Sequence, residues 1–380
     1  MNSTTPAKLD RFRVFLWLFA ALQMGTPSGS AAEILKQPRT YAIGLGYVTA
    51  HRPLSVTAAY DHIARAADIA YIQKTWSEWQ RPETLDEVTI ARHKGLKIYL
   101  ALDLLSYSAP PRRDVVLADG AASNFSSPAV QAAYLQLVTD LVRAYQPDYV
   151  VPLVEANLHA AHNPGSYSAF KQWYPQVFQT IRRLSPGTRI GVSMSYADYM
   201  SPSGFGAEDR EAYRRAIKDF EPYSDMVCAS VYPFLLYVGP RLTTSPPLTF
   251  HPRPSGIPED FFNELAGGSS LPLFISETSW VSRTFDIAGI IRIQSSPEDQ
   301  SDYVARLTEL AGRAQAQGQK IEAINFVSLV DPDERSCDAA LTASGLSWFC
   351  SLALMNSTAQ DKPAFVTMET WKRDEPYRGP

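Results

Sequence analysis

The sequence predicts an α/β fold, more specifically a (β/α)8 barrel, on the basis of three observations. Short apolar runs rich in β-branched and aromatic residues alternate along the chain with longer amphipathic runs. Most of the short runs are continuously apolar, as expected for a parallel sheet that is covered on both faces. Eight of them start about 27 to 53 residues apart, which favours a closed barrel over an open doubly wound sheet.

The expected strands share this apolar character and end in polar or aromatic residues. They are the ranges 41–48, 69–76, 96–105, 149–155, 189–196, 226–232, 273–278 and 323–330. Helices are expected between them, because the intervening runs place apolar residues at helical spacing. The clearest cover 55–67, 128–145 and 296–317, and each begins with or directly after a serine that can cap a helix.

The first residues have the composition of a secretory leader. Three basic residues precede a short apolar run at 14–22, and small residues at 28–32 offer a cleavage site. The run is far shorter than the roughly 20 residues that span a bilayer, although a retained membrane anchor is the alternative. We therefore expect a signal peptide at 1–32, a secreted or periplasmic location, and one domain over 33–380.

Charge limits the classes of binding partner, and the cysteines bear on the redox environment. The net charge is −4 without a basic stripe, so neither nucleic acid nor stable membrane insertion is expected, and the chain should act as a monomer. Cys337 and Cys350 flank a segment of small residues, and in an exported protein they either form a disulfide or stay free. Cys228 lies in an apolar run and is expected to be a buried thiol.

Two glutamates follow hydrophobic runs at the ends of expected strands. Glu155 ends the fourth strand and Glu277 the seventh, so each places a carboxyl group at the mouth of the barrel, where such folds carry their chemistry. Glycoside hydrolysis needs two carboxyl groups on either side of one bond, one protonated and one ionised. Separate structural roles, one residue in a salt bridge and the other capping a helix, are the alternative.

Other polar and aromatic residues at strand ends complete the candidate site. Sugar rings present apolar faces, which aromatic side chains can contact, and their hydroxyls bind to polar groups. The candidates are Trp76, Asp103, Asn157, Tyr196, Tyr232 and Trp280. Each aromatic residue taken singly is equally compatible with packing.

At these residues the chain resembles clan A of the glycoside hydrolases, which are retaining (β/α)8 enzymes. The nearest match is family 53, the endo-β-1,4-galactanases. The islands of similarity are Leu153-Val-Glu-Ala-Asn157, Asp225-Met-Val-Cys-Ala-Ser-Val-Tyr-Pro233, Ile275-Ser-Glu-Thr278 and Lys362-Pro-Ala364.

The resemblance implies a role for several of these residues. Glu155 would be the acid/base and Glu277 the nucleophile, with Tyr232 donating a hydrogen bond to Glu277. Trp76 and Trp280 would line the sugar site. The implied reaction is hydrolysis of a β-linked polysaccharide or oligosaccharide by double displacement, with no cofactor and no metal.

The chain departs from the clan's pattern at several positions. The asparagine that precedes the clan's acid/base, and binds the sugar hydroxyl next to the reacting carbon, is Val154 here. The arginine often found at the end of strand two is absent, and Lys74 is the nearest substitute. These departures keep a second reading open, in which the chain is a non-catalytic carbohydrate-binding barrel.

Two other hydrolytic chemistries have weaker signals. His159 and His162, together with Asp103, could hold a metal ion, but no acidic residue lies between the two histidines. Ser193 lies in a Gly-Val-Ser-Met-Ser run that lacks the second glycine of a serine hydrolase elbow. We therefore expect neither a metal centre nor a nucleophilic serine.

Overall fold

The computed structural model describes residues 38–47, 53–81, 83–106, 113–196, 207–236, 248–287, 291–333, 337 and 347–379. The signal peptide predicted at 1–32 lies outside these residues. Within them, no helix combines the length and the apolar composition needed to cross a membrane.

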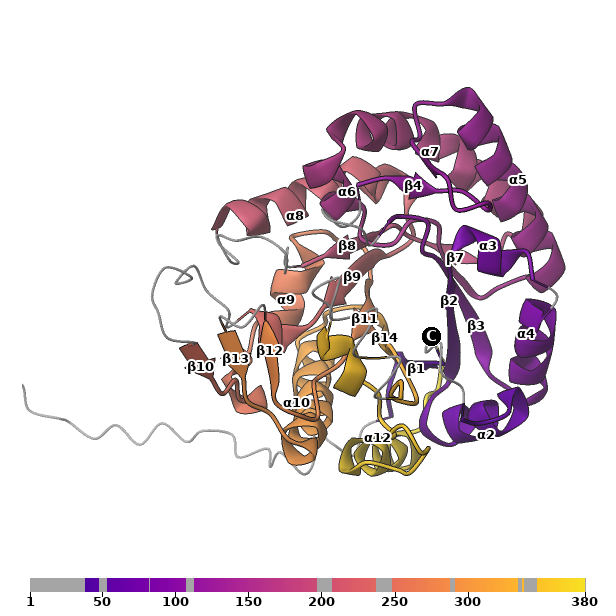
Figure 1. The fold of residues 1–380 in the computed structure, drawn as a ribbon. Helices are drawn as coiled ribbons and strands as arrows, with labels where there is room; N and C mark the ends of the chain where they lie inside the picture. The colour runs from indigo at the N-terminus through magenta and orange to yellow at the C-terminus, as the bar shows by residue number, and fades with distance from the viewer. Residues whose placement is uncertain are drawn as a thin grey trace, which may run out of the picture.

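The described chain folds as an α/β barrel, as the sequence predicts (Figure 1). Its central sheet has the order β7-β6-β3-β2-β1-β14-β11-β9-β8, and every pairing in it is parallel. The strands are β1 (Ala42–Gly46), β2 (Ile69–Lys74), β3 (Lys97–Leu102), β6 (Tyr149–Val151), β7 (Arg189–Ile190), β8 (Ser193–Ser195), β9 (Val227–Val231), β11 (Leu273–Thr278) and β14 (Ile321–Phe326).

The sheet closes through its fifth expected strand, which the structure divides in two. β7 pairs with β6, whereas β8, only two residues later, pairs with β9 on the other side. Gly191 lies between the two halves, and a Cβ atom there would be 2.8 Å from the carbonyl oxygen of Met226. A residue without a side chain therefore lets this strand pass from one neighbour to the other.

Helices form the outer ring around this sheet (Figure 1). They are α2 (Val56–Ala66), α3 (Trp76–Trp79), α4 (Glu83–His93), α5 (Pro128–Tyr145), α6 (Ala156–His162), α7 (Pro164–Leu184), α8 (Ala207–Phe220), α9 (Phe261–Ala266), α10 (Pro297–Ala316) and α12 (Pro363–Asp374). The helices expected at 55–67, 128–145 and 296–317 correspond to α2, α5 and α10. Ser55 and Ser296 cap the first and last of these by accepting from backbone N–H groups three residues on.

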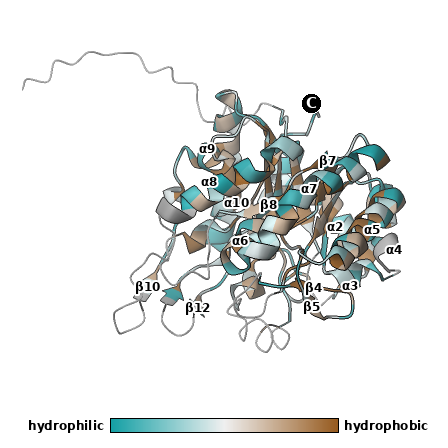
Figure 2. Cartoon of the chain, turned by 90° about the horizontal axis from the view of Figure 1, so that it is seen from above, coloured by the Kyte–Doolittle hydropathy of each residue, from teal (hydrophilic) through white to brown (hydrophobic). Residues whose placement is uncertain are grey.

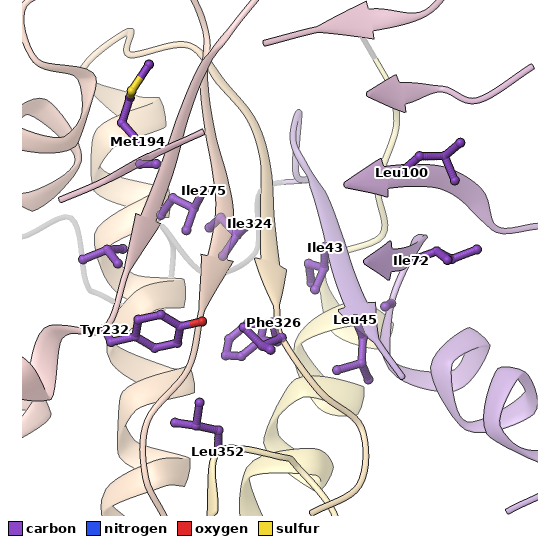
Figure 3. Close-up of a cluster of buried hydrophobic side chains, with 14 of the residues drawn as sticks. Ile43, Leu45, Ile72, Leu100, Met194, Tyr232, Ile275, Ile324, Phe326 and Leu352 are labelled. Carbon is purple, nitrogen blue, oxygen red and sulfur yellow. The ribbon is translucent and has the colours of Figure 1, made fainter. Parts of the chain in front are cut away.

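Strand alternation separates two hydrophobic layers. Ile43, Leu100 and Ile324 join the large cluster that includes the buried faces of the helices (Figure 3). Their strand neighbours Tyr99 and Ala323 belong to a separate cluster, which fills the barrel interior. Figure 2 shows hydrophobic colouring on the strands and mixed colouring on the surrounding helices.

The strands end earlier than the hydrophobic runs suggest. β6 stops at Val151 instead of continuing to residue 155, because Pro152 has no N–H group to donate to the neighbouring strand. β2 stops at Lys74, and Trp76 already begins α3. Glu155 and Trp76 are therefore held by a turn and a short helix rather than by strand pairing.

Small antiparallel elements supplement the barrel. β4 (Val115–Val116) and β5 (Ala122–Ser123) form a hairpin after β3. β10 (Leu248–Phe250), β12 (Phe285–Ile287) and β13 (Ile291–Ile293) form a separate sheet, which projects from one side in Figure 1. Short 3-10 helices occur at η1 (Glu221–Tyr223), η2 (Pro233–Leu235), η3 (Pro254–Gly256) and η5 (Ser347–Ser351).

Three aspartates stabilise the N-terminal end of the barrel in the same way. Asp68, Asp148 and Asp225 each lie one or two residues before a strand. Each donates its N–H group to an isoleucine carbonyl on the adjacent strand and accepts that isoleucine's N–H with its carboxylate. Each also pairs with an arginine, and the pairs are Asp68 with Arg39 (2.9 Å), Asp148 with Arg92 (3.1 Å) and Asp225 with Arg182.

Candidate active site

Glu155 and Glu277 reach the same end of the barrel by different local structures. Glu155 lies in the turn after β6 and caps α6, with a left-handed backbone (φ 52°) that is uncommon for a residue with a side chain. Glu277 belongs to β11, where the pairing register shifts between Ile275 and Glu277. Such irregularities redirect a side chain next to an active site. Both side chains are buried, with 1% and 4% of their surface exposed.

One hydroxyl group contacts both carboxylates. Ser230 on β9 lies in register with Glu277. Its Oγ donates to Oε1 of Glu155 at 2.8 Å and is 3.4 Å from Oε2 of Glu277. The two carboxylate oxygens are therefore at most 6.2 Å apart, the sum of these two distances. The structure brings together the two residues that the sequence singled out.

Two tyrosines also donate hydrogen bonds to Glu277. The predicted bond from Tyr232 is present, from its hydroxyl to Oε2 of Glu277 at 3.1 Å. Tyr71 of β2 donates to Oε1 at 2.8 Å. Burial, and then the negative charge of Glu277, raise the pKa of Tyr71 well above its ordinary value, so its phenol stays a donor. Hydrogen bonds to the ionised form favour a charged Glu277.

A polar chain continues from Tyr71 to Asp103. The Tyr71 hydroxyl also contacts Oε1 of Gln73, and the Gln73 amide nitrogen donates to Oδ2 of Asp103 at 2.8 Å. The sequence predicted Asp103 as a sugar contact from its place near the end of the third expected strand. In the structure its carboxylate accepts from the Gln73 amide, whose oxygen faces Tyr71.

Sequence analysis did not single out Tyr71, Gln73 or Ser230. A signal for them exists in the strand period of two. Ser230 lies two residues before Tyr232, and Tyr71 two before Gln73, so each pair shares one face of its strand. Placing Tyr232 inside the barrel would have placed Ser230 there as well.

Two other predicted sugar contacts are occupied by the protein itself. The Asn157 amide donates to the carbonyl of Ser195 at 2.8 Å and accepts from the N–H of Ser195 at 2.7 Å. The Tyr196 hydroxyl donates to Oε2 of Glu264 at 2.8 Å. Asn157 therefore ties α6 to β8, and Tyr196 contacts α9. These contacts correspond to structural roles rather than to the predicted sugar binding.

The two predicted tryptophans pack within the protein. Trp280 is fully buried, with its ring against Tyr303 and its indole N–H donating to Ser295 Oγ at 3.1 Å. Trp76, 4% exposed, packs edge-on against Tyr134 of α5. The Trp280 ring is enclosed by other side chains and has no free face for a sugar, whereas Trp76 also lines a pocket between α3 and α5. The sequence analysis gave packing as the alternative for each aromatic residue.

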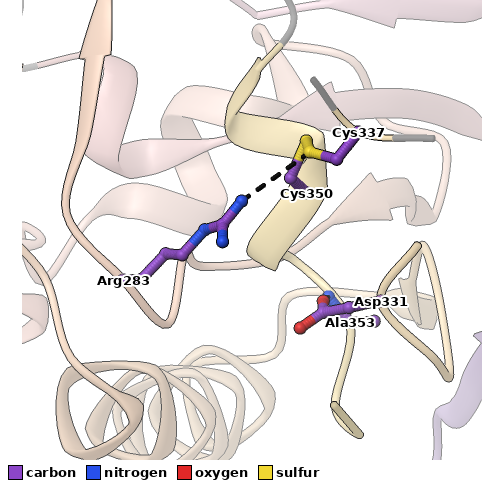
Figure 4. Close-up of a disulfide and its surroundings, with 5 residues drawn as sticks. All are labelled: Arg283, Asp331, Cys337, Cys350 and Ala353. Carbon is purple, nitrogen blue, oxygen red and sulfur yellow. Dashed lines mark hydrogen bonds between the residues drawn. A yellow bond between two sulfur atoms is a disulfide. The ribbon is translucent and has the colours of Figure 1, made fainter. Parts of the chain in front are cut away.

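The rim beside Tyr232 is cross-linked by the disulfide between Cys337 and Cys350, which the sequence left open (Figure 4). Cys350 belongs to η5, and the neighbouring Trp348 packs against Tyr232 with ring centres 4.8 Å apart. The covalent link therefore lies close to one of the tyrosines that bind Glu277.

A buried ion pair supports the same rim. Lys362, from the Lys-Pro-Ala motif, contacts Oδ2 of Asp331 at 2.5 Å, and Oδ1 of Asp331 accepts from the N–H of Ala353 at 3.0 Å. Burial raises the pKa of Asp331 to about 6, while the Lys362 ammonium acts in the opposite direction. This carboxylate consequently titrates closer to neutral pH than an ordinary aspartate.

The two alternative chemistries find no support in the described residues. His159 is buried against Phe125, and no group of three potential metal ligands forms anywhere in this part of the chain. The Ser193 hydroxyl pairs with Ser276 Oγ at 3.0 Å rather than with a histidine.

Comparison with known proteins places the fold among glycoside hydrolases. No family model and no curated protein sequence matches the chain. Among solved structures, a GH5_18 protein from Streptomyces cattleya in complex with GlcNAc aligns with a TM-score of 0.63 at 14% identity, over 90% of this chain and 82% of that one. The β-glycosidase BGL167 aligns at 0.59 with 10% identity, over 86% and 87%.

A family 39 glycoside hydrolase from the gut symbiont Bacteroides cellulosilyticus WH2 aligns with a TM-score of 0.53 and 13% identity. That alignment covers 89% of this chain and 64% of the other. At such identities the similarity establishes the barrel fold and does not distinguish family 53.

Proposed function

We propose that this chain is a retaining glycoside hydrolase that acts on a β-linked polysaccharide or oligosaccharide. The observation that carries the proposal is the pair of buried carboxylates, Glu155 and Glu277, joined by one serine hydroxyl at the C-terminal end of the barrel. The similarity in fold to solved glycoside hydrolases adds support.

The proposed mechanism assigns opposite protonation states to the two residues. Glu277 attacks the anomeric carbon and forms a glycosyl ester, while Glu155 gives its proton to the leaving oxygen. Glu155 then takes a proton from water as the water displaces Glu277, which restores both groups. Tyr71 and Tyr232 stabilise the charged form of Glu277, as the attacking residue requires.

The two carboxyl groups lie close enough to flank one glycosidic bond. Retaining enzymes hold their carboxyl groups about 5–5.5 Å apart, and inverting enzymes about 6.5–9.5 Å apart, because inversion needs room for a water molecule. The limit of 6.2 Å applies to the one pair of oxygens bonded to Ser230, so the configuration of the product is the measurement that separates retention from inversion.

We also propose that the chain acts outside the cytoplasm. The basic and apolar composition of residues 1–32 supports export, and the disulfide between Cys337 and Cys350 fits an oxidising compartment. Expression of the full chain with its leader, followed by N-terminal sequencing of the exported product, tests this. Product that stays in the cytoplasm would contradict it, and an exported product that retains residues 1–32 would favour the membrane anchor.

A carbohydrate-binding barrel without catalysis is the second candidate, and Val154 favours it. The Val154 side chain is 1% exposed and belongs to the cluster that fills the barrel interior. It stands where the clan carries an asparagine that binds the sugar, and Asn157 is engaged with Ser195.

Azide rescue of activated aryl β-glycosides tests the proposal. Azide should restore turnover to Glu155→Ala and give a β-glycosyl azide, because the ester on Glu277 still forms. In Glu277→Ala, azide should attack from the vacant face and give the α-glycosyl azide. The panel should also include β-1,4-galactan, the substrate that the family 53 resemblance implies, with native Glu155 and Glu277 in place.

Glu322→Gln is the matched control, since this carboxylate lies on β14 near the opposite end of the barrel and pairs with Arg189. It should retain activity without azide. If the wild type binds glycans but hydrolyses no β-glycoside, the hydrolase proposal is wrong and the chain is a carbohydrate-binding barrel.

A further inference from the structure

Ser230 lies on β9 between the two carboxylates. It is in register with Glu277 on β11 and with Ser195 on β8, and it is fully buried. Its Oγ is 2.8 Å from Oε1 of Glu155 and 3.4 Å from Oε2 of Glu277. This hydroxyl therefore contacts both groups that the proposed mechanism requires in opposite protonation states.

The direction of these hydrogen bonds depends on the protonation of Glu155. A serine hydroxyl has one hydrogen to donate, and an ionised carboxylate only accepts. With both glutamates ionised, Ser230 can donate to only one of them, and the shorter distance is to Glu155. With Glu155 protonated, Glu155 can donate to Ser230, which then turns its own hydrogen to Glu277. The bonds then run in one direction and reinforce each other.

We propose that Ser230 is a positioning residue that links the protonation of Glu155 to the charge of Glu277. A negative Glu277 accepts the Ser230 hydrogen and so favours the protonated form of Glu155. A neutral group at position 277 leaves Ser230 to donate to the Glu155 carboxylate. The role of this link in catalysis rests on the proposed function. The link itself can be measured in the protein without substrate.

The link acts at the point of the cycle where Glu155 changes role. When the ester forms, Glu277 exchanges its negative charge for a bond to the anomeric carbon, and the proton of Glu155 leaves with the leaving group. Ser230 then donates to the newly ionised Glu155, which stabilises the form that must deprotonate water. Hydrolysis of the ester returns the charge to Glu277 and a proton to Glu155.

Other titratable groups near the pair must be considered in any titration. Among the described residues they include the phenols of Tyr71, Tyr99 and Tyr232 and, beyond Gln73, the carboxyl of Asp103. Burial raises the pKa of Tyr71 and of Tyr99, so both stay protonated through the range in which carboxyl groups titrate. Asp103 is the group whose titration needs a control.

The test is a four-variant titration of Glu155 by carboxyl 13C NMR, without substrate, on the full-length protein. Glu277→Gln should lower the pKa of Glu155 because a negative neighbour is removed. With Ser230 present the drop should be larger, by about one pKa unit, than in a Ser230→Ala background. Ser230→Thr keeps a hydroxyl and should restore the larger drop, whereas Asp103→Asn should leave the difference unchanged.

Equal drops in the two backgrounds would overturn the link, because a purely structural serine would change both titrations alike. Ser230→Cys, whose thiol is only a weak donor, provides the same comparison where the alanine variant does not fold. If the two backgrounds differ in the drop of the Glu155 pKa but the protein hydrolyses no glycoside, the link holds and the proposed hydrolase function is wrong. If the protein hydrolyses glycosides but the two drops are equal, the hydrolase function holds and the link is wrong.

Discussion

The two ends of the barrel use carboxylates in different ways. At the N-terminal end, Asp68, Asp148 and Asp225 each pair with an arginine and with the backbone of a neighbouring strand. At the C-terminal end, the contacts described for Glu155 and Glu277 come from hydroxyl groups. A guanidinium can only donate hydrogen bonds to a carboxylate, whereas a serine hydroxyl can both donate and accept.

This difference corresponds to a division between stability and chemistry. An aspartate bonded to both an arginine and a strand backbone stabilises the sheet only while it is charged. A catalytic carboxylate must gain or lose a proton during the reaction, so a partner that can both donate and accept suits it. Barrels of this type carry their active sites at the C-terminal end, and the N-terminal end serves stability.

Exchange of Glu277 for glutamine should have the largest effect on activity. Glu277→Gln keeps the shape of the side chain but removes the attacking anion, so turnover should fall about 10⁴-fold or more. Thermal unfolding should show little change, because one tyrosine hydroxyl can still donate to the amide oxygen and the other can accept from the amide nitrogen. A variant that retains a tenth of the wild-type rate would show that Glu277 is not the nucleophile.

The corresponding exchange at the other end should act on stability. Asp225→Asn removes the charge that pairs with Arg182 but leaves an oxygen for the N–H of Ile190. We expect the free energy of unfolding to fall by about 2 kcal/mol in urea titrations. Activity per folded molecule should stay near the wild-type value. A large loss of turnover with unchanged stability would contradict the assignment of stability to the N-terminal end and chemistry to the C-terminal end.

Removal of one phenol should have an intermediate effect on turnover. Tyr71→Phe deletes the 2.8 Å hydrogen bond to Glu277, while the ring can keep its stacking on Tyr99. A hydrogen bond to a charged group contributes about 1.5–3 kcal/mol, so kcat/KM should fall at least about tenfold. The matched control is Tyr134→Phe, whose hydroxyl bonds the carbonyl of Pro152. Equal rates for both variants would show that Tyr71 does not support Glu277.

The smallest expected effect concerns the pH dependence of stability. Asp331 has a folded pKa of about 6, above the unfolded value near 3.9, so the folded state binds more protons between these values. Its contribution to stability therefore falls as the pH rises from about 4 to 6. Relative to Asp331→Asn, the wild type should lose at most about 2 kcal/mol across this window in urea titrations. Parallel pH profiles for the two proteins would contradict the raised pKa.

The strands and their order of appearance were accessible from the sequence, because a parallel sheet buried on both faces requires long apolar runs. The helices at α2, α5 and α10 were accessible for a related reason, since capping serines and helical spacing are local signals. The split of the fifth strand was not. It depends on the approach of Gly191 to Met226, two segments that meet only in the folded barrel.

In the candidate site, too, the sequence predicts what depends on local position and misses what depends on distant partners. Glu155 and Glu277 follow from position at strand ends, whereas the bond from Tyr232 was implied by the family resemblance. The hydrogen bonds of Asn157 to Ser195 and the burial of Trp280 against Tyr303 do not, because their partners come from distant segments.

By itself, the sequence determined the barrel and the delivery of two carboxylates to its mouth, because periodicity and strand ends are local properties. Only the tertiary structure decided which groups those carboxylates contact. Ser230 meets Glu155 and Glu277 across 75 and 47 residues of chain. No local pattern encodes such a contact, since it depends on how β9 and β11 pair and on where the turn after β6 places Glu155.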